Sequence, residues 1–191
     1  MIVAITQGGP RLPENIRAAL DAGADRVLVR EATLPEGLDA VALAYPSRIV
    51  LHTRMPGALA LAASLPVGVH FASTVPADAW RAAGAAPFSV STHTVDEARA
   101  ARAAGAAWVL LSPIWRSPSK PGDTRPPLGV GVLGAVDGAV ALGGVDAARV
   151  GACRAAGAAG VAGMGGLFGA PDVGAAVSAW RAAWRGPDQK V

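Results

Sequence analysis

The chain has 191 residues, 52% of them hydrophobic, and a formal net charge of +3. Such a length is most simply one domain, and no apolar run reaches the roughly 18 residues that indicate a membrane span. The arginines are scattered, which argues against a nucleic-acid partner, and the single cysteine, Cys153, excludes an internal disulfide. The N-terminal run has no charged leader, so we expect no signal peptide and a cytoplasmic protein.

Short apolar runs alternate with alanine-rich helical patterns, and each run is a predicted strand. The phrase Ala-Gly-Ala separates the two patterns four times, around Gly23, Gly84, Gly105 and Gly157. Glycine at a helix C-terminus adopts the left-handed conformation that closes the helix. The predicted strands are Ile2–Thr6, Arg26–Arg30, Arg48–Thr53, Gly68–Phe71, Phe88–His93, Trp108–Pro113, Ala139–Gly143 and Gly160–Met164.

Helices are expected between most of these strands. Pro13 lies in the first turn of the first helix, and Thr94 and Glu97 form a capping box that opens the fifth. Any helix after the sixth strand is short and begins no earlier than Leu128, whereas Asp172–Arg185 forms a closing helix.

Helical crossovers between successive strands imply a parallel sheet. Eight near-equal units, with no Gly-x-Gly-x-x-Gly after the first strand, favour a closed barrel over a doubly wound open sheet. We therefore predict an α/β fold, a single (β/α)8 TIM barrel over residues 1–185, with a flexible tail over residues 186–191. Ligands of such barrels bind in the loops that follow the strands.

The loop after the sixth strand, Ile114–Pro127, is too rich in Pro, Ser and Gly to be helical. Ser117, Ser119 and Lys120 supply two hydroxyls and an ammonium, groups that suit a phosphate. Trp115 lies in the same loop and could shelter the ring of a ligand. A long loop of this kind is usually functional or disordered.

Paired glycines follow the seventh and eighth strands, at Gly143–Gly144 and in the run Gly163-Met164-Gly165-Gly166. TIM barrels frequently bind phosphate at these two strand ends, through backbone N–H groups that glycine leaves accessible. Tight turns alone would also explain the glycines, but their presence at both strand ends favours a phosphate site.

The three histidines, His52, His70 and His93, lie at or near the ends of three consecutive predicted strands. We expect at least one of them to act in the site, with His52 and His93, together with Lys120, as the candidate catalytic residues and His70 as a substrate-binding residue. A three-histidine metal centre is the weaker alternative. Arg30 and Arg54 follow the second and third strands and could reach an anion in the barrel mouth, although surface ion pairs are an equal alternative.

Four motifs resemble the thiamine-phosphate synthase and thiazole tautomerase (TenI) family. Val90–Ala98 is similar to Val-Ser-Thr-His-Thr-x-Glu-Glu-Ala, and Ser112–Lys120 to Gly-Pro-Ile-Phe-Pro-Thr-Pro-Thr-Lys. Ala141–Val145 resembles Ala-Ile-Gly-Gly-Ile, and Gly68–Phe71 resembles Gly-Val-His-Leu. The resemblance runs from Ile5 through the eighth strand and implies a (β/α)8 barrel that acts on thiazole phosphate in thiamine biosynthesis.

The resemblance also implies roles for individual residues. Ser117, Ser119, Gly144 and the backbone at Met164–Gly165 would hold the thiazole or product phosphate. Lys120 would face the pyrophosphate of a pyrimidine substrate, and Ser91 would lie beside the pyrimidine. Arg30 and Arg54 match the arginines of the family's Gln-Leu-Arg-x-Lys and Asn-Asp-Arg motifs.

Three departures from the family pattern bear on the reaction. Ala32 replaces a lysine, His52-Thr53-Arg54 replaces Asn-Asp-Arg, and Ala72–Val75 contains no acid, so both magnesium carboxylates are missing. The tautomerase histidine is also missing, because Ser112-Pro113 stands in its place. His52 or His93 could transfer protons instead, since a histidine titrates near neutrality.

We therefore expect metal-independent, tautomerase-like proton transfer on thiazole phosphate, without a cofactor. A divergent synthase, the one alternative in which magnesium would serve, and a non-catalytic binder of thiazole or thiamine phosphate also remain open. A sugar-phosphate isomerase or epimerase is a weaker rival. The expected partner is a small phosphorylated heterocycle rather than nucleic acid or membrane, and the sequence is compatible with an oligomer.

Overall fold

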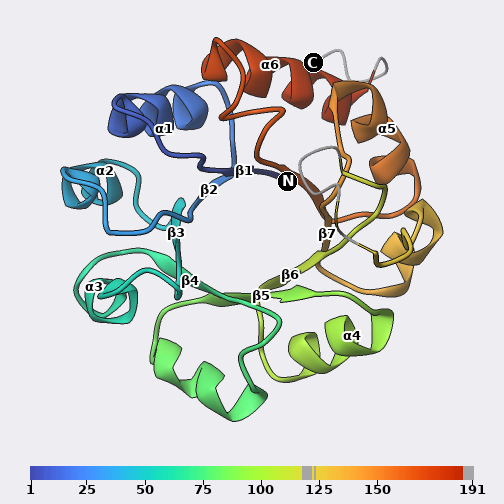
Figure 1. Cartoon of the computed structure of the whole chain (residues 1–191), viewed down its shortest axis with the longest axis horizontal. Helices are drawn as coiled ribbons and strands as arrows, with labels where there is room; N and C mark the ends of the chain where they lie inside the picture. Colours follow the sequence, from blue (N-terminus) through green and yellow to red (C-terminus); the bar gives the residue numbers. More distant parts are fainter. Residues whose placement is uncertain (118–121, 123, 187–191) are drawn as a thin grey trace.

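The eight strands form a closed, fully parallel barrel in the order β1 to β8, with β1 paired to β8 (Figure 1). This arrangement is a computed structural model that describes residues 1–117, 122 and 124–186. The TIM-barrel prediction is confirmed. The strands are β1 Ile2–Ile5, β2 Arg26–Val29, β3 Ile49–His52, β4 Gly68–Phe71, β5 Phe88–Thr92, β6 Trp108–Leu111, β7 Ala139–Ala141 and β8 Gly160–Gly163.

Helices surround the barrel on its outer face (Figure 1). The α-helices of the described chain are α1 Leu12–Asp21, α2 Leu38–Ala44, α3 Ala58–Ser64, α4 Val95–Ala103, α5 Ala147–Ala155 and α6 Val173–Arg185. Two crossovers instead carry 3₁₀ helices, η1 Ala77–Ala83 and η2 Val130–Ala135. None of the helices described here is both long enough and apolar enough to cross a bilayer.

The predicted helix signals are confirmed with one exception. Gly23, Gly105 and Gly157 follow α1, α4 and α5 with φ of +103°, +97° and +85°, the left-handed region that ends a helix. Gly84 follows the 3₁₀ helix η1 and combines φ 59° with ψ −126°, so it closes no α-helix. Thr94 caps α4 by accepting a hydrogen bond from the Glu97 N–H at 3.1 Å.

Most strands end one or two residues before their predicted C-terminal limits. Arg30, Thr53 and His93 fall just beyond β2, β3 and β5, and Pro113, which has no N–H for a ladder, lies beyond β6. Polar residues therefore start the loops at the carboxyl ends of the strands rather than extend the sheet. This end of the barrel carries most of the predicted site residues.

Side chains on each strand alternate between the barrel interior and the layer beneath the helices. The interior is filled mainly by apolar residues, which form a cluster separate from the larger core between strands and helices. Above this packing, towards the carboxyl ends of the strands, the interior positions become polar. The interior cluster comprises Val3, Ile5, Leu28, Val50, Trp108, Leu110, Val140 and Ala162.

A partly buried ion pair connects α6 to the segment that precedes β2. Arg181 on α6 donates to the Gly23 carbonyl and lies 2.6 Å from the Asp25 carboxylate. The same carboxylate accepts a hydrogen bond from the backbone N–H of Ile2 in β1. The last helix is thus held to the first two strands.

Candidate active site

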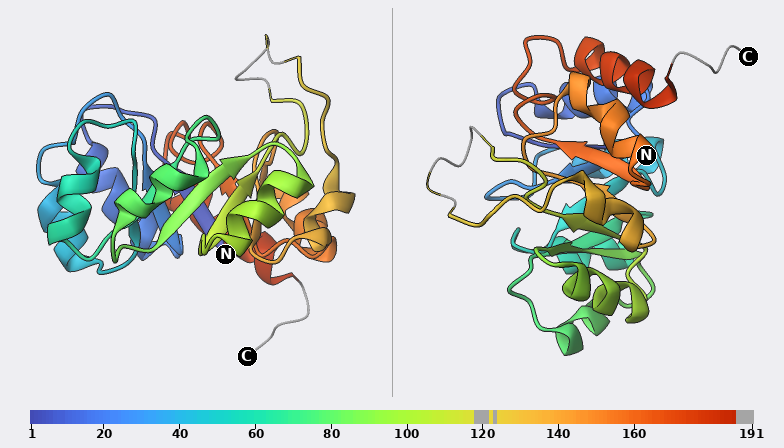
Figure 2. Two further views of the ribbon diagram at one scale, coloured as in Figure 1. Left: turned by 90° about the horizontal axis from the view of Figure 1, so that it is seen from below. Right: turned by 90° about the vertical axis from the view of Figure 1, so that its right-hand side faces the viewer.

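The candidate site lies at the carboxyl ends of the strands. The described parts of the connection between β6 and η2, residues 112–117 and 124–129, rise from the end of the barrel opposite Met1 (Figure 2). The loops after β7 and β8 lie beside this connection. Their mutual contacts show which predicted phosphate-binding residues come together.

Three loops meet closely at Gly144. A Cβ on Gly144 would lie 2.6 Å from the Arg116 carbonyl oxygen and 2.7 Å from the Trp115 Cβ, and its φ is +64°. A Cβ on Gly166 would lie 4.0 Å from the carbonyl oxygen of Val145. The loops after β6, β7 and β8 therefore pack against one another, and the glycine at 144 is required for that approach.

Backbone N–H groups remain available where these loops meet. None of the described residues accepts a hydrogen bond from the amides of Gly144, Gly165 or Gly166. A Cβ on Gly165 would meet no described atom within 4 Å, so there is open space on the Cβ side of this residue. Uncommitted amides beside open space suit an anion such as phosphate. Ser117 precedes this region, while Ser119 and Lys120 lie outside the described residues.

Arg149, which sequence reasoning missed, adds a positive charge beside these amides. Its Nη1 donates to the Gly144 carbonyl at 2.6 Å, and its guanidinium carbon lies 5.2 Å from the centre of the Trp115 ring. Trp115 therefore packs against an arginine of α5, and its role as a shelter for a ligand ring stays a prediction. Arg149 lies in the first turn of α5, just after Gly143–Gly144, and this spacing is the signal that could have found it.

Two arginines stand at the opposite side of the mouth. Glu31, the carboxylate nearest in sequence to Arg30, accepts hydrogen bonds from the Thr6 hydroxyl and from the Gly8 N–H at 3.0 Å. No described residue accepts a hydrogen bond from the guanidinium of Arg30 or Arg54, whose hydrogen bonds come from the backbone N–H. Burial and the neighbouring Arg54 charge lower the pKa of Arg30. An anionic ligand would relieve this repulsion.

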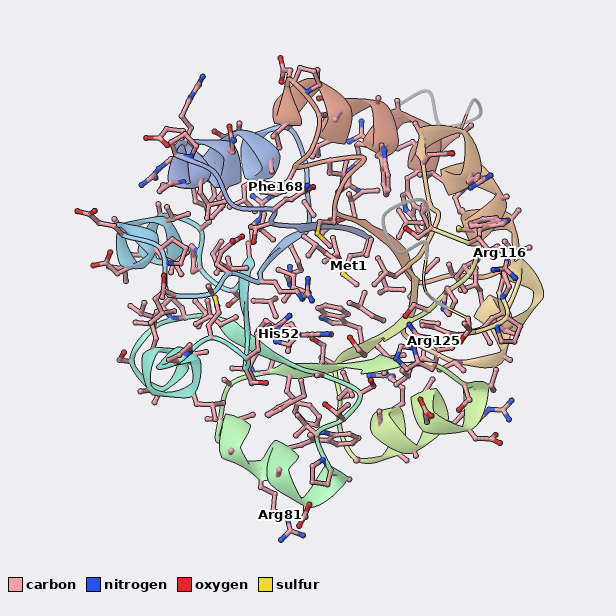
Figure 3. All side chains as sticks on the ribbon, in the orientation of Figure 1. Met1, His52, Arg81, Arg116, Arg125 and Phe168 are labelled. Atoms are coloured by element: carbon pink, nitrogen blue, oxygen red, sulfur yellow. The ribbon has the colours of Figure 1, made fainter. Side chains whose placement is uncertain are left out.

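His52 projects into the centre of the ring of strands (Figure 3) and is 6% exposed. Its Nδ1 accepts a hydrogen bond from the Arg54 N–H at 3.1 Å. Burial, followed by the charges of Arg30 and Arg54, lowers the pKa of His52 to about 4. The prediction that His52 titrates near neutrality is therefore wrong, because two cations and burial disfavour its protonated form.

His70 is 1% exposed, and hydroxyl groups occupy both of its ring nitrogens. Ser89 Oγ lies 2.8 Å from Nδ1, and Ser91 Oγ lies 2.8 Å from Nε2. Burial lowers the pKa of His70 well below its usual value, with further contributions from His52 and Arg30. The prediction that His70 binds substrate directly is corrected, because neither ring nitrogen is left for a ligand. Among Ser89, His70 and Ser91, only Ser91 is partly exposed.

His93 lies just after β5, and its ring contacts Ser73 and Ser112. Its Nδ1 lies 2.8 Å from the Ser112 carbonyl oxygen and 3.4 Å from the Ser112 hydroxyl, and the closer group can only accept, which favours the proton on Nδ1. Its Nε2 then has a lone pair, 3.1 Å from the Ser73 hydroxyl. His93 is partly exposed and contacts Ser112, the position where the family pattern has its histidine. Ser73 was missed because the pairing depends on a neighbouring loop.

The residues at the two family magnesium positions do not fit that ion. The Thr53 hydroxyl donates to the His70 carbonyl at 3.2 Å, and Ala72–Val75 offers no carboxylate. Magnesium prefers carboxylate and water oxygens, whereas cationic Arg30 and Arg54 lie here. Within the described ranges, no three His, Cys, Asp or Glu side chains gather as a metal site.

Comparison with known proteins agrees with the family resemblance of the four sequence motifs. The family model "Thiamine monophosphate synthase" (TMP-TENI) matches residues 2–167. Thiamine-phosphate synthase of Roseiflexus castenholzii is 34% identical over 188 residues, covering 90% of this chain and 81% of that protein. The thiamine biosynthesis bifunctional protein ThiM/ThiE of Symbiobacterium thermophilum is 37% identical over 187 residues, covering 90% of this chain.

The chain spans only 38% of the length of the bifunctional relative. Among solved structures, thiamine phosphate pyrophosphorylase from Pyrococcus furiosus matches with a TM-score of 0.79 at 20% identity, covering 96% of this chain and 95% of that one. At this identity the structural likeness supports the barrel fold. Because the family model covers most of the sequence, the chain belongs to the thiamine monophosphate synthase (TMP-TENI) family.

Proposed function

We propose that this protein catalyses metal-independent, tautomerase-like proton transfer on a thiazole phosphate, with His93 as the general base. The observation that carries the proposal is the set of contacts around the His93 ring. Nδ1 faces the Ser112 carbonyl, and Nε2 faces the hydroxyl of the exposed residue Ser73, which the substrate would displace. His52 is the poorer candidate, because its Nδ1 is already occupied and its pKa is about 4.

The phosphate would bind where the loops after β6, β7 and β8 meet. The amides of Gly144, Gly165 and Gly166, which have no acceptor among the described residues, would donate to its oxygens, and Arg149 would supply charge. Binding at this end anchors the ring over the barrel mouth. Orientation by a remote phosphate is a common way to hold a reacting ring against a catalytic group.

The proton transfer balances within the substrate and one histidine. Nε2 of His93 takes a proton from one ring atom, and the ring electrons redistribute over the heterocycle. The resulting imidazolium keeps its Nδ1–H bond to the Ser112 carbonyl and returns the proton to a different ring atom. Substrate and product therefore have the same formula, and negative charge that develops on the ring would be stabilised by Arg30 and Arg54.

A divergent synthase is the second candidate, and two observations favour it. The Roseiflexus castenholzii relative, of which this chain covers 81%, is named thiamine-phosphate synthase. Arg30 and Arg54, whose guanidinium groups have no hydrogen-bond acceptor among the described residues, could also neutralise a departing pyrophosphate. In this function the arginines would stand in for the missing magnesium carboxylates.

The experiment incubates the full chain with thiazole phosphate in D₂O and follows deuterium uptake and isomerisation by NMR, with EDTA present. H93N should lower the rate by about 10² to 10⁴, the range for loss of a general base, whereas the neighbouring T92A should not. The Thr92 hydroxyl is buried on the same strand and donates to the Leu110 carbonyl at 3.1 Å.

Each other outcome rejects the first proposal in favour of a defined alternative. Pyrophosphate release on addition of pyrimidine pyrophosphate and magnesium, with no exchange in its absence, would identify the synthase. Binding of thiazole phosphate without either reaction would identify a non-catalytic binder. Exchange that is unaffected by H93N would exclude His93 as the base.

A further inference from the structure

A series of hydrogen bonds runs along the inside of the barrel, from a buried serine to the mouth. The Ser89 hydroxyl lies 3.3 Å from the Val69 carbonyl oxygen and 2.8 Å from His70 Nδ1. His70 Nε2 lies 2.8 Å from the Ser91 hydroxyl. Ser89 is 1% exposed, whereas Ser91 is partly exposed two residues nearer the mouth. Only Ser91 can therefore meet a ligand.

The His70 ring is held firmly between its neighbours. The Trp108 ring is stacked on it with a centroid distance of 5.7 Å, and the His52 ring meets it edge-on at 5.3 Å. Because the ring is fixed and neutral, Ser89, His70 and Ser91 can differ only in the positions of their protons. A neutral imidazole carries one N–H, so one nitrogen donates and the other accepts.

The two proton arrangements differ in the number of hydrogen bonds. With the proton on Nδ1, His70 donates to Ser89, Ser89 donates to the Val69 carbonyl, and Ser91 donates to Nε2, which makes three bonds. With the proton on Nε2, Ser89 must donate to Nδ1 and its bond to Val69 is lost. One extra net hydrogen bond favours the first arrangement by about fivefold.

We propose that Ser89 and His70 are positioning residues that make Ser91 a hydrogen-bond acceptor at the barrel mouth. In the favoured arrangement the Ser91 proton points inward to Nε2, and the oxygen lone pairs face the ligand. The ligand group opposite Ser91 is therefore a donor, such as an amino or ring N–H group on a heterocycle. A ligand that offers only an acceptor binds the other proton arrangement, in which the His70 proton is on Nε2. This switch should cost about fivefold in affinity.

The inference rests on the proposed function only in taking the mouth as the ligand site. Its first test needs no ligand, so the two can fail separately. Long-range ¹H–¹⁵N NMR of the histidine-labelled full chain reports which ring nitrogen carries the proton, and H70N assigns the signals. We expect His70 to be protonated at Nδ1 in the wild type and to shift towards Nε2 in S89A. The matched control T92A, which removes a buried hydroxyl from the outer face of the same strand, should leave the tautomer unchanged.

The second test measures ligand preference with two ring-matched probes. The full chain should bind 4-aminopyrimidine about fivefold more tightly than 4-methoxypyrimidine, and S89A should reduce this ratio towards one although Ser89 cannot touch either probe. His70 protonated at Nε2 in the wild type would overturn the proposal even if S89A failed to fold. A tautomer or a probe preference that does not respond to S89A would overturn it as well.

Discussion

The buried His52 side chain predicts a specific loss of stability in acid. Well above pH 6.5 the imidazole is neutral in both the folded and the unfolded chain. As the pH falls further, the unfolded chain takes up a proton that the folded chain does not accept until about pH 4. The unfolded state then binds more protons, so the free energy of unfolding decreases as the pH falls.

The magnitude follows from the two pKa values. Lowering the pKa from 6.5 to about 4, at about 1.4 kcal/mol for each unit of pKa, corresponds to about 3.5 kcal/mol when both states are protonated. Between pH 7 and pH 4.5 the loss due to His52 should be about 2.5 kcal/mol. The amide of H52N cannot be protonated in this range, and its oxygen can replace Nδ1 as the acceptor of the Arg54 N–H.

Urea unfolding of wild type and H52N across this pH range measures the difference. His70 lowers the stability of both proteins in acid in the same direction, so subtracting one curve from the other leaves the contribution of His52 together with its coupling to His70. The free energy of unfolding of H52N minus that of the wild type should increase by about 2.5 kcal/mol when the pH falls from 7 to 4.5. T92A should change the free energy of unfolding, relative to the wild type, by the same amount at every pH. Parallel curves of the free energy of unfolding against pH for wild type and H52N would refute the assignment to His52.

Two further predictions concern the anion site. G144A should lower the free energy of unfolding by about 2–4 kcal/mol, because the new Cβ combines a left-handed φ with backbone contacts below 3 Å. G165A, which has no such contacts, should change the free energy of unfolding by less than about 0.5 kcal/mol, and equal effects in urea titrations would contradict the packing argument. R30Q should weaken binding of thiazole phosphate about 10- to 100-fold by calorimetry, whereas R99Q, which removes an exposed charge on α4, should not; equal losses would point to net charge alone.

The fold was predictable from the sequence because its signals are local and repeated. Glycines after α1, α4 and α5 mark the helix ends, and apolar runs mark every strand of the barrel. The strand limits were less accurate, since polar residues such as Arg30 and His93 continue an apolar run without joining the ladder. The glycines after β7 and β8 were correctly expected to lie near each other, because neighbouring parallel strands bring their carboxyl ends together.

The chemistry of the site was less predictable because it depends on contacts between distant loops. The pKa of His52 follows from burial beside Arg30 and Arg54, which no spacing of letters reveals. Ser73 reaches His93 from the preceding β-strand's loop, and Arg149 folds back over Trp115. Only the three-dimensional arrangement separates the two histidines that the sequence left equivalent.

The ion pair between Arg181 and Asp25 affects how this protein is made. The two side chains are 156 positions apart, and the arginine belongs to α6, which leaves the ribosome after all eight strands of the barrel. Until α6 emerges, the carboxylate that also receives the Ile2 amide lacks the Arg181 guanidinium. We therefore expect the nascent barrel to become fully stable only after α6 has been synthesised, and a chain that is cut short before residue 181 to remain a target for chaperones and proteases.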